Sequence, residues 1–241
     1  PSRGLGDVYK RQPPSPGARR WFAVNAVIAW LGLAVSLTLT VTALYPSTVT
    51  IPTRYGADHA AGLGSRLADW VSYFTIWSNV VVAVVMSILA WGRPRASAAL
   101  RAARLDSVLL ITITGLVYAV VLAPISVQRG WENVSNTLLH QVTPVLTVLV
   151  WALAGPRGWV TWRTVLHALV ILVAWVSWML LHGAVVGAYP YPFVDVAVLG
   201  YPRALANIVG ILGLGLLMAA GFLGVERLLA RRQQRPEGLR E

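Results

Sequence analysis

Two of the most apolar stretches of the chain carry side chains that can act as a nucleophile and a base. The stretch FTIWSNVVVAVV holds Thr75 and Asn79 at i and i+4, with Ser78 beside them, so all three lie on or next to one helix face. The stretch NTLLHQVTPVL holds a histidine on a second polar stripe, formed by Asn136, His140, Thr143 and Thr147. A threonine hydroxyl attacks an ester only when a base removes its proton, and a neutral imidazole suits that task near neutral pH. A dyad of Thr75 and His140 is therefore possible, provided that the fold brings the two stripes together.

A third stripe and one loop add further candidates. Trp175, Trp178 and His182 recur at intervals of three and four, Asn207 begins the last apolar stretch, and Tyr191 and Asp195 lie in the loop before it. An amide without a partner in an apolar medium costs roughly 2–7 kcal/mol. We therefore expect these polar groups to face one another or a watered cavity, and not lipid.

Each candidate also has a structural interpretation. A threonine or serine in a membrane helix often bonds the carbonyl one turn back, and an asparagine such as Asn79 often bonds a neighbouring helix. His182 is equally compatible with an interfacial position, and His59 and His167 are interpreted as bystanders. Asp106 is interpreted as the cap of the third apolar stretch, because carboxylates cap helix N-termini.

Supporting roles can be assigned only as alternatives. Asn79, Asn136 or Gln141 are candidate donors to the oxyanion of an ester-cleaving reaction, and Asp195 is a candidate partner for His140 or His182. No metal and no other cofactor is expected, because the chain has no cysteine and its four histidines lack metal-ligand spacing.

The composition indicates which elements position these residues. Hydrophobic residues make up 56% of the chain and charged residues only 12%, whereas a soluble domain carries about 25% charged residues. A helix needs about 20 apolar residues to cross a bilayer. Six segments qualify, and they predict an all-α polytopic membrane protein with six transmembrane helices in one bundle: residues 21–45, 70–91, 107–127, 136–154, 165–185 and 204–228.

The distribution of basic residues predicts the orientation. Of the 20 lysine and arginine residues, 16 fall on the side that holds both termini, which is therefore expected to be cytoplasmic. This bias also accounts for the net charge of +11 without nucleic acid as a partner. With alternate spans running inward, and at about 1.5 Å per residue, Thr75 and His140 lie at nearly the same depth in the outer half of the bilayer.

The remaining segments are short. Residues 1–12, PSRGLGDVYKRQ, differ in composition from the rest of the chain and are interpreted as a read-through of a cloning adapter, not as native chain. A short basic segment, residues 13–20, then precedes the transmembrane domain, residues 21–228, and a basic cytoplasmic tail comes after it at residues 229–241.

The order of these motifs resembles a known family. FTIWSNVVVAVV, NTLLHQVTPVL, WVSWMLLH and YPYPFVD together resemble the six-span family of the androgen-induced protein and the androgen-dependent TFPI-regulating protein, whose bacterial relatives are the Pr-six-Pr membrane proteins. The resemblance implies an intramembrane hydrolase of fatty acid esters of hydroxy fatty acids, with Thr75 as nucleophile and His140 as base. It also implies counterparts for His182 and for Tyr191–Phe193. Phe74 and the Ser78–Asn79 pair depart from the family pattern, which leaves the substrate open.

Three classes of function therefore remain. The first is a lipid ester hydrolase in a bacterial plasma membrane, with membrane lipids and a lipid ester as its partners. The second is a non-enzymatic protein that binds or transports a small amphiphile, although no inverted repeat and no acidic residue deep within a span favours transport. The third is a purely structural membrane protein. The oligomeric state is not predicted.

Overall fold

Helices are the only regular secondary structure among the residues that the structure describes. The computed structural model describes residues 14–44, 62–91 and 97–233, and these contain α-helices, π-helices and 3-10 helices but no strand. Five of its helical stretches are long and apolar enough to cross a membrane, and a bent helix pair would make a sixth. The all-helical prediction is thus confirmed, and the long apolar helices are compatible with a multi-pass membrane protein. The adapter segment, the end of the basic tail and His59 lie outside the described residues.

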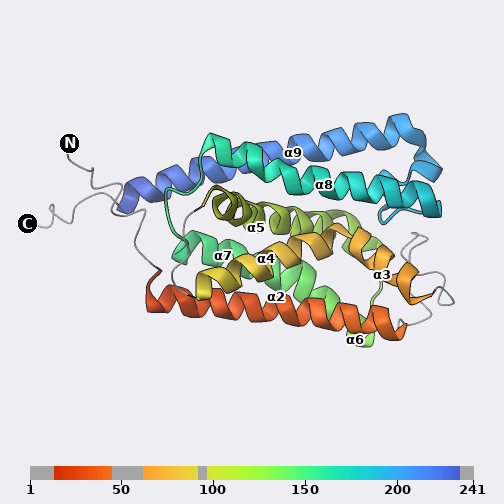
Figure 1. Cartoon of the computed structure of the whole chain (residues 1–241), viewed down its shortest axis with the longest axis horizontal. Coiled ribbons are helices and arrows are strands. Elements are labelled where there is room, and N and C mark those ends of the chain that lie inside the picture. Colours follow the sequence, from red (N-terminus) through yellow and green to blue (C-terminus); the bar gives the residue numbers. More distant parts are fainter. Residues whose placement is uncertain (1–13, 45–61, 92–96, 234–241) are drawn as a thin grey trace, which may run out of the picture.

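One helix lies at the centre of the bundle. Helix α5 (Ala98–Val117) packs against α4 (Phe74–Ala90), α7 (Thr143–Ala154), α8 (Trp162–Val186) and α9 (Val196–Gln233). The two outer layers are visible in Figure 1: α8 and α9 lie side by side above α5, and α2 (Pro16–Thr42) runs below α4 and α7. Residues Pro16 and Gln233, the first and last helical residues, lie at the same end of the bundle.

The second apolar stretch, for which the sequence predicted one helix, is not straight. It is divided between α3 (Leu63–Ser72) and α4, which are bent by 76° around Tyr73. Tyr73 is extended, with φ −74° and ψ 126°, and the Trp77 indole donates to the carbonyl of Val71 at 2.7 Å. The bend leaves the N-terminus of α4 inside the bundle, and Thr75 is its second residue.

Two further helices contain a wide turn, and a proline explains each one. Helix α5 continues into the π-helix Tyr118–Leu122 and the 3-10 helix Ala123–Ile125, whereas α6 (Gly130–Thr137) continues through the π-helix Leu138–Val142 into α7. Pro124 and Pro144 lie just after these π-helices. A proline has no N–H to donate to the carbonyl four residues back and its ring clashes with that carbonyl, so the preceding turn widens. The carbonyl opposed by Pro144 belongs to His140, and π-turns of this kind are frequent at functional sites.

The ends of the helices differ from the predicted caps. Ser97 caps α5 by accepting from the N–H of Leu100 at 3.1 Å, whereas Asp106 lies buried within that helix. The interpretation of Asp106 as the cap is therefore wrong, because the helix begins two turns earlier. Helix α9 is interrupted at Gly200, whose φ of 71° favours glycine.

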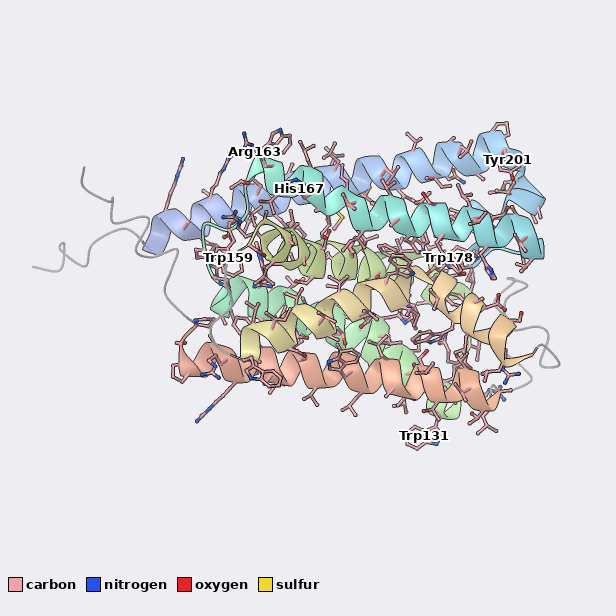
Figure 2. The ribbon with its side chains drawn as sticks, viewed as in Figure 1. Trp131, Trp159, Arg163, His167, Trp178 and Tyr201 are labelled. Carbon is pink, nitrogen blue, oxygen red and sulfur yellow. The ribbon has the colours of Figure 1, made fainter. Side chains whose placement is uncertain are left out.

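Aromatic side chains lie toward both ends of the bundle. Trp159 lies toward the end of the bundle where α2 begins and α9 ends, whereas Trp131, Trp178 and Tyr201 lie toward the opposite end (Figure 2). Trp131 and Tyr201 are mostly exposed, as expected of side chains in the aromatic belts of a membrane protein.

Candidate functional site

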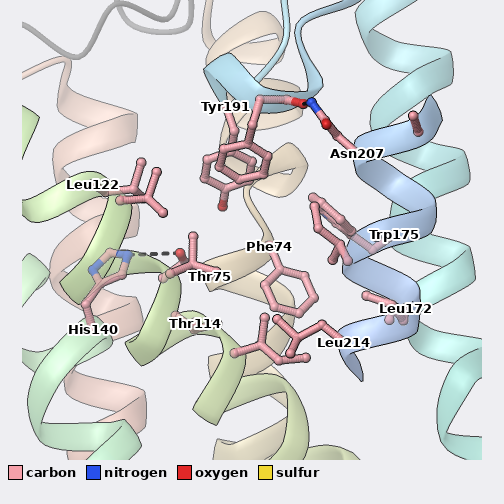
Figure 3. A pocket seen from close by; sticks show the side chains of 17 residues that line it. Phe74, Thr75, Thr114, Leu122, His140, Leu172, Trp175, Tyr191, Asn207 and Leu214 are labelled. Atoms are coloured by element: carbon pink, nitrogen blue, oxygen red, sulfur yellow. Dashed lines mark hydrogen bonds between the residues drawn. The ribbon is translucent and has the colours of Figure 1, made fainter. Parts of the chain in front are cut away.

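The bend between α3 and α4 and the wide turn before α7 bring a threonine against a histidine. Thr75 Oγ1 and His140 Nε2 are 3.0 Å apart, although the two residues are 65 positions apart in the chain. Figure 3 shows this contact at one side of a pocket. Thr75 is buried and His140 is half-buried, so only limited water competes for the interaction.

The second ring nitrogen of His140 fixes its tautomer. His140 Nδ1 lies 3.2 Å from the carbonyl oxygen of Asn136, which can only accept a hydrogen bond. Nδ1 therefore carries the proton, and Nε2 is left as the acceptor for the Thr75 hydroxyl. The ring of Tyr118 stacks on the imidazole with 4.6 Å between the ring centroids, and the Tyr118 hydroxyl accepts from Asn136 Nδ2 at 2.6 Å. The imidazole is thus held from one face and one edge in the orientation that a base requires.

Asn79 connects the helix of the threonine to the helix of the histidine. Its Nδ2 donates to the carbonyl of Thr75 at 2.8 Å and to the carbonyl of Leu139 at 3.2 Å. Ser78 Oγ bonds the Thr75 carbonyl at 3.0 Å and the hydroxyl of Thr114 at 2.8 Å. Because both N–H groups of Asn79 are used on carbonyls, this side chain holds the frame of the site and has no donor free for a substrate oxygen.

Thr75 and His140 face a pocket with a volume of about 410 Å³. Its walls come from α4, α5 with its π-helix, the π-helix before α7 that carries His140, α8, α9 and the loop before α9. Among the described lining residues, the polar side chains are those of Thr75, Thr114, His140, Asn207, Tyr191 and the indole of Trp175, and none is Asp, Glu, Lys or Arg. Four lining residues are exposed, and they place the opening of the pocket between the end of α5 and α9: Val121, Ala206, Gly210 and Leu214. A mostly apolar pocket of this size fits a ligand with a hydrocarbon chain and few polar atoms.

The loop before α9 closes the pocket above the threonine. Tyr191 is buried, and its phenol points toward Thr75 (Figure 3). Burial raises the pKa of Tyr191 to about 12, although the polar groups of Thr75 and the backbone of Phe74 oppose this shift. Asn207 Nδ2 donates to the carbonyl of Phe193 at 2.7 Å, and the Phe193 ring stacks on that of Tyr191. Asn207 therefore fixes this loop to α9.

Other residues singled out in the sequence lie away from the reacting pair. Gln141 is exposed and does not line the pocket. Asp195 accepts from the N–H of Ala197 at 2.9 Å, and His182 is paired with Asp69, whose Oδ1 lies 2.8 Å from His182 Nε2. His182 thus joins α8 to α3 rather than entering the pocket.

The sequence did not single out two residues that contact the candidate histidines: Asp69, which pairs with His182, and Tyr118, which stacks on His140. Asp69 immediately precedes the predicted second span, so an acidic residue at that boundary was an available signal. Tyr118 gave no signal, because its stacking on His140 depends on two π-turns that the sequence pattern does not reveal. Within the described parts of the chain, no three His, Cys, Asp or Glu residues are grouped in a way that would hold a metal ion.

Comparisons with known proteins do not assign the chain to a family. No family model, no curated protein and no solved structure matches it. The function is therefore inferred from the site itself.

Proposed function

We propose that this protein is an intramembrane hydrolase of lipid esters in which Thr75 is the nucleophile and His140 the general base. The observation that carries the proposal is the 3.0 Å contact between Thr75 Oγ1 and His140 Nε2, together with the contact of His140 Nδ1 with the Asn136 carbonyl, which leaves Nε2 as the acceptor. This arrangement of an activated hydroxyl, a base and a group that orients the base is the general requirement for nucleophilic catalysis.

The reaction follows from the positions of the donors and acceptors. Thr75 Oγ1 forms a bond to the ester carbonyl carbon while its proton passes to His140 Nε2, and the carbonyl π pair moves onto the oxygen. When this intermediate collapses, the bond to the alcohol oxygen breaks and His140 returns the proton to that oxygen. Water then attacks the acyl-threonine with His140 as base, releasing the fatty acid and restoring the Thr75 hydroxyl.

The chemistry of the pocket supports a lipid as substrate. Its described walls are mostly apolar and lack a carboxylate, lysine or arginine, so they favour acyl chains over a charged headgroup. The opening lies on the apolar flank of α9, where Val209 and Leu217 are exposed. A membrane lipid ester would reach the dyad sideways through this opening, with both chain termini on the cytoplasmic side of a bacterial plasma membrane. A fatty acid ester of a hydroxy fatty acid, the substrate implied by the resemblance to the androgen-induced protein family, has chains of this type.

Activity-based labelling tests the assignment. Detergent-purified protein is treated with a fluorophosphonate that carries an alkyl chain, and wild type is compared with Thr75→Ala, Thr75→Ser and His140→Ala. We expect labelling of wild type and Thr75→Ser and none of the other two, with the labelled peptide containing position 75. Labelling of Thr75→Ala at the wild-type rate would show that another residue is the nucleophile.

The second candidate is a non-enzymatic protein that binds a small amphiphile, which the apolar character of the pocket favours. It predicts that a fluorescent fatty ester binds wild type and Thr75→Ala with the same affinity and is recovered uncleaved from both. Cleavage by wild type alone would exclude it.

A further inference from the structure

The N-terminus of α4 is unusual because it lies inside the bundle and beside the candidate nucleophile. The first N–H groups of a helix have no carbonyl partner within that helix, and Phe74 and Thr75 are the first two residues of α4. The extended Tyr73 and the 76° bend separate them from the carbonyls of α3. Neither residue is exposed to water that would satisfy these donors: Phe74 and Thr75 are each 7% exposed.

A buried phenol lies at the same place. Tyr191 is 6% exposed, lines the pocket together with Phe74 and Thr75, and directs its hydroxyl toward Thr75 (Figure 3). Its ring is held by an edge contact with Tyr73 at 6.0 Å between centroids and by stacking on Phe193 at 5.2 Å. The backbone of Phe74 and Thr75 and the phenol of Tyr191 therefore border the same part of the pocket.

The donors that the sequence suggested for this task are used elsewhere. The Asn79 amide bonds two carbonyls, the Asn136 amide bonds the Tyr118 hydroxyl, and Gln141 is exposed. A reaction through a tetrahedral intermediate nevertheless needs donors close to the nucleophilic oxygen.

We propose that the backbone N–H groups of Phe74 and Thr75 and the phenol of Tyr191 form the oxyanion-binding site of this protein, with the carbonyl oxygen of a carboxylic ester as its ligand. This inference rests on the proposed function. In the resting site the Thr75 proton points at His140, and the Tyr191 phenol is directed toward Thr75 from the loop before α9. When the ester binds, its carbonyl oxygen accepts hydrogen bonds from the two backbone N–H groups and from the phenol.

The charge balance of the step agrees with this arrangement. As Thr75 Oγ1 bonds the carbonyl carbon, the negative charge develops on the carbonyl oxygen and the positive charge on His140. The positive end of the α4 dipole faces the oxyanion. Because burial raises the pKa of Tyr191 to about 12, its phenol remains a neutral donor and does not lose its own proton at neutral pH.

Two variants remove the donors separately. Tyr191→Phe removes the phenol and keeps the ring, and Tyr189→Phe is its matched control, because Tyr189 is a buried tyrosine of the same loop that does not line the pocket. Phe74→Pro removes one N–H group, and the conformation of Tyr73 is one that a residue before proline adopts. Phe74→Ala is the control for the loss of the Phe74 ring.

The measurement is hydrolysis of a long-chain p-nitrophenyl ester by the detergent-purified full chain, together with inhibition by a long-chain trifluoromethyl ketone, which forms a tetrahedral adduct. Loss of one oxyanion donor lowers kcat by about 10²–10³-fold. We expect kcat to fall by this factor in Tyr191→Phe relative to wild type, and in Phe74→Pro relative to Phe74→Ala. In both comparisons KM should be nearly unchanged, and the affinity for the ketone should fall in parallel with kcat. Tyr189→Phe should retain wild-type kcat.

The outcomes separate the two proposals. Thr75-dependent hydrolysis that is retained in both Tyr191→Phe and Phe74→Pro would overturn the oxyanion site and leave the dyad in place. Hydrolysis that does not depend on Thr75, or none by folded wild type, would overturn the proposed function and with it this site. If Tyr191→Phe lowers both kcat and the melting temperature but binds the ketone as tightly as wild type, the role of Tyr191 is structural.

Discussion

Asn79 donates to the carbonyl of Leu139, the residue directly before His140, across 60 positions of the chain. The same amide nitrogen holds the carbonyl of Thr75. One side chain therefore sets the distance between the helix that carries the candidate nucleophile and the turn that carries the candidate base. Sequence reasoning suggested Asn79 either as an interhelical contact or as a catalytic donor, and the hydrogen bonds correspond to the interhelical contact.

Replacing Asn79 should weaken the dyad without removing either of its members. Asn79→Leu keeps the approximate size of the side chain but removes the donor to the carbonyls of Thr75 and Leu139. Leaving a buried acceptor without its partner typically lowers the free energy of unfolding by about 1–3 kcal/mol. We expect a lower melting temperature and a fall in kcat for the p-nitrophenyl ester of about tenfold or more, since small misplacements of reacting groups are costly. Thr112→Val is the control, because the Thr112 hydroxyl donates to the carbonyl of Val108 in its own helix. Unchanged kcat in Asn79→Leu would contradict the positioning role.

The hydroxyl of Thr75 should matter more than its shape. Thr75→Val is nearly isosteric but has no nucleophile, whereas Thr75→Ser keeps the hydroxyl and loses a methyl group. We expect Thr75→Ser to retain measurable hydrolysis and Thr75→Val to lose about 10³-fold or more, in the range seen when a catalytic nucleophile is removed. Steady-state hydrolysis of purified, equally folded proteins checks this, and equal activity of the two variants would count against Thr75 as nucleophile.

The opening of the pocket can be tested on α9. Gly210 lines the pocket, and a side chain added there meets no atom within 4 Å, so Gly210→Phe should fold and project its ring across the opening. Gly213 is equally unobstructed but does not line the pocket, which makes Gly213→Phe the matched control. We expect Gly210→Phe to slow hydrolysis of long-chain esters much more than that of acetyl esters. If both variants show the same chain-length profile as wild type, the substrate does not pass Gly210.

A buried ion pair at the other end of the bundle should contribute to stability only. Arg157 Nη1 lies 3.5 Å from Glu226 Oε2, and Glu226 Oε1 accepts from the N–H of Gly158 at 2.8 Å. Glu226 is 2% exposed, and removing one member of a buried pair typically costs about 3–5 kcal/mol. Glu226→Ala should therefore lower the melting temperature in detergent markedly, whereas Arg227→Ala, at an exposed neighbouring position, should not. Hydrolysis per folded molecule should be unchanged in both, because neither residue lines the pocket.

The pKa of Tyr191 predicts a pH profile. Burial raises this pKa to about 12, so the phenol is protonated in the folded protein throughout the range from about pH 7 to pH 10. We therefore expect the ratio of kcat between wild type and Tyr191→Phe to be constant over this range. Since the raised pKa favours the protonated form in the folded state, any stability that Tyr191 contributes by this route is present below about pH 10, the ordinary pKa of tyrosine, and is lost as the pH rises from there through about 12. A ratio that falls steadily above about pH 8 would show that the phenol ionises earlier and would contradict its role as a neutral donor.

Local patterns in the sequence were sufficient to predict the class of fold and the helix faces on which the candidate residues lie. Hydrophobic runs of the length of a bilayer, separated by short charged loops, permit only helices, because every backbone polar group in lipid needs a partner within the segment. Helical spacing then placed Thr75 with Asn79, and His140 with Asn136, on shared faces. These features follow from the local geometry of a helix, so they can be predicted from one segment without knowing which helices lie next to it.

How these faces meet depends on the packing of the helices against one another. The bend at Tyr73 and the wide turns before Pro124 and Pro144 rotate side chains by amounts that a regular period of 3.6 residues does not predict. They determine that His140 reaches Thr75, whereas His182 pairs with Asp69. Long-range hydrogen bonds depend on the register between helices, and that register is fixed by the packing of the whole bundle rather than by any single stretch of the sequence.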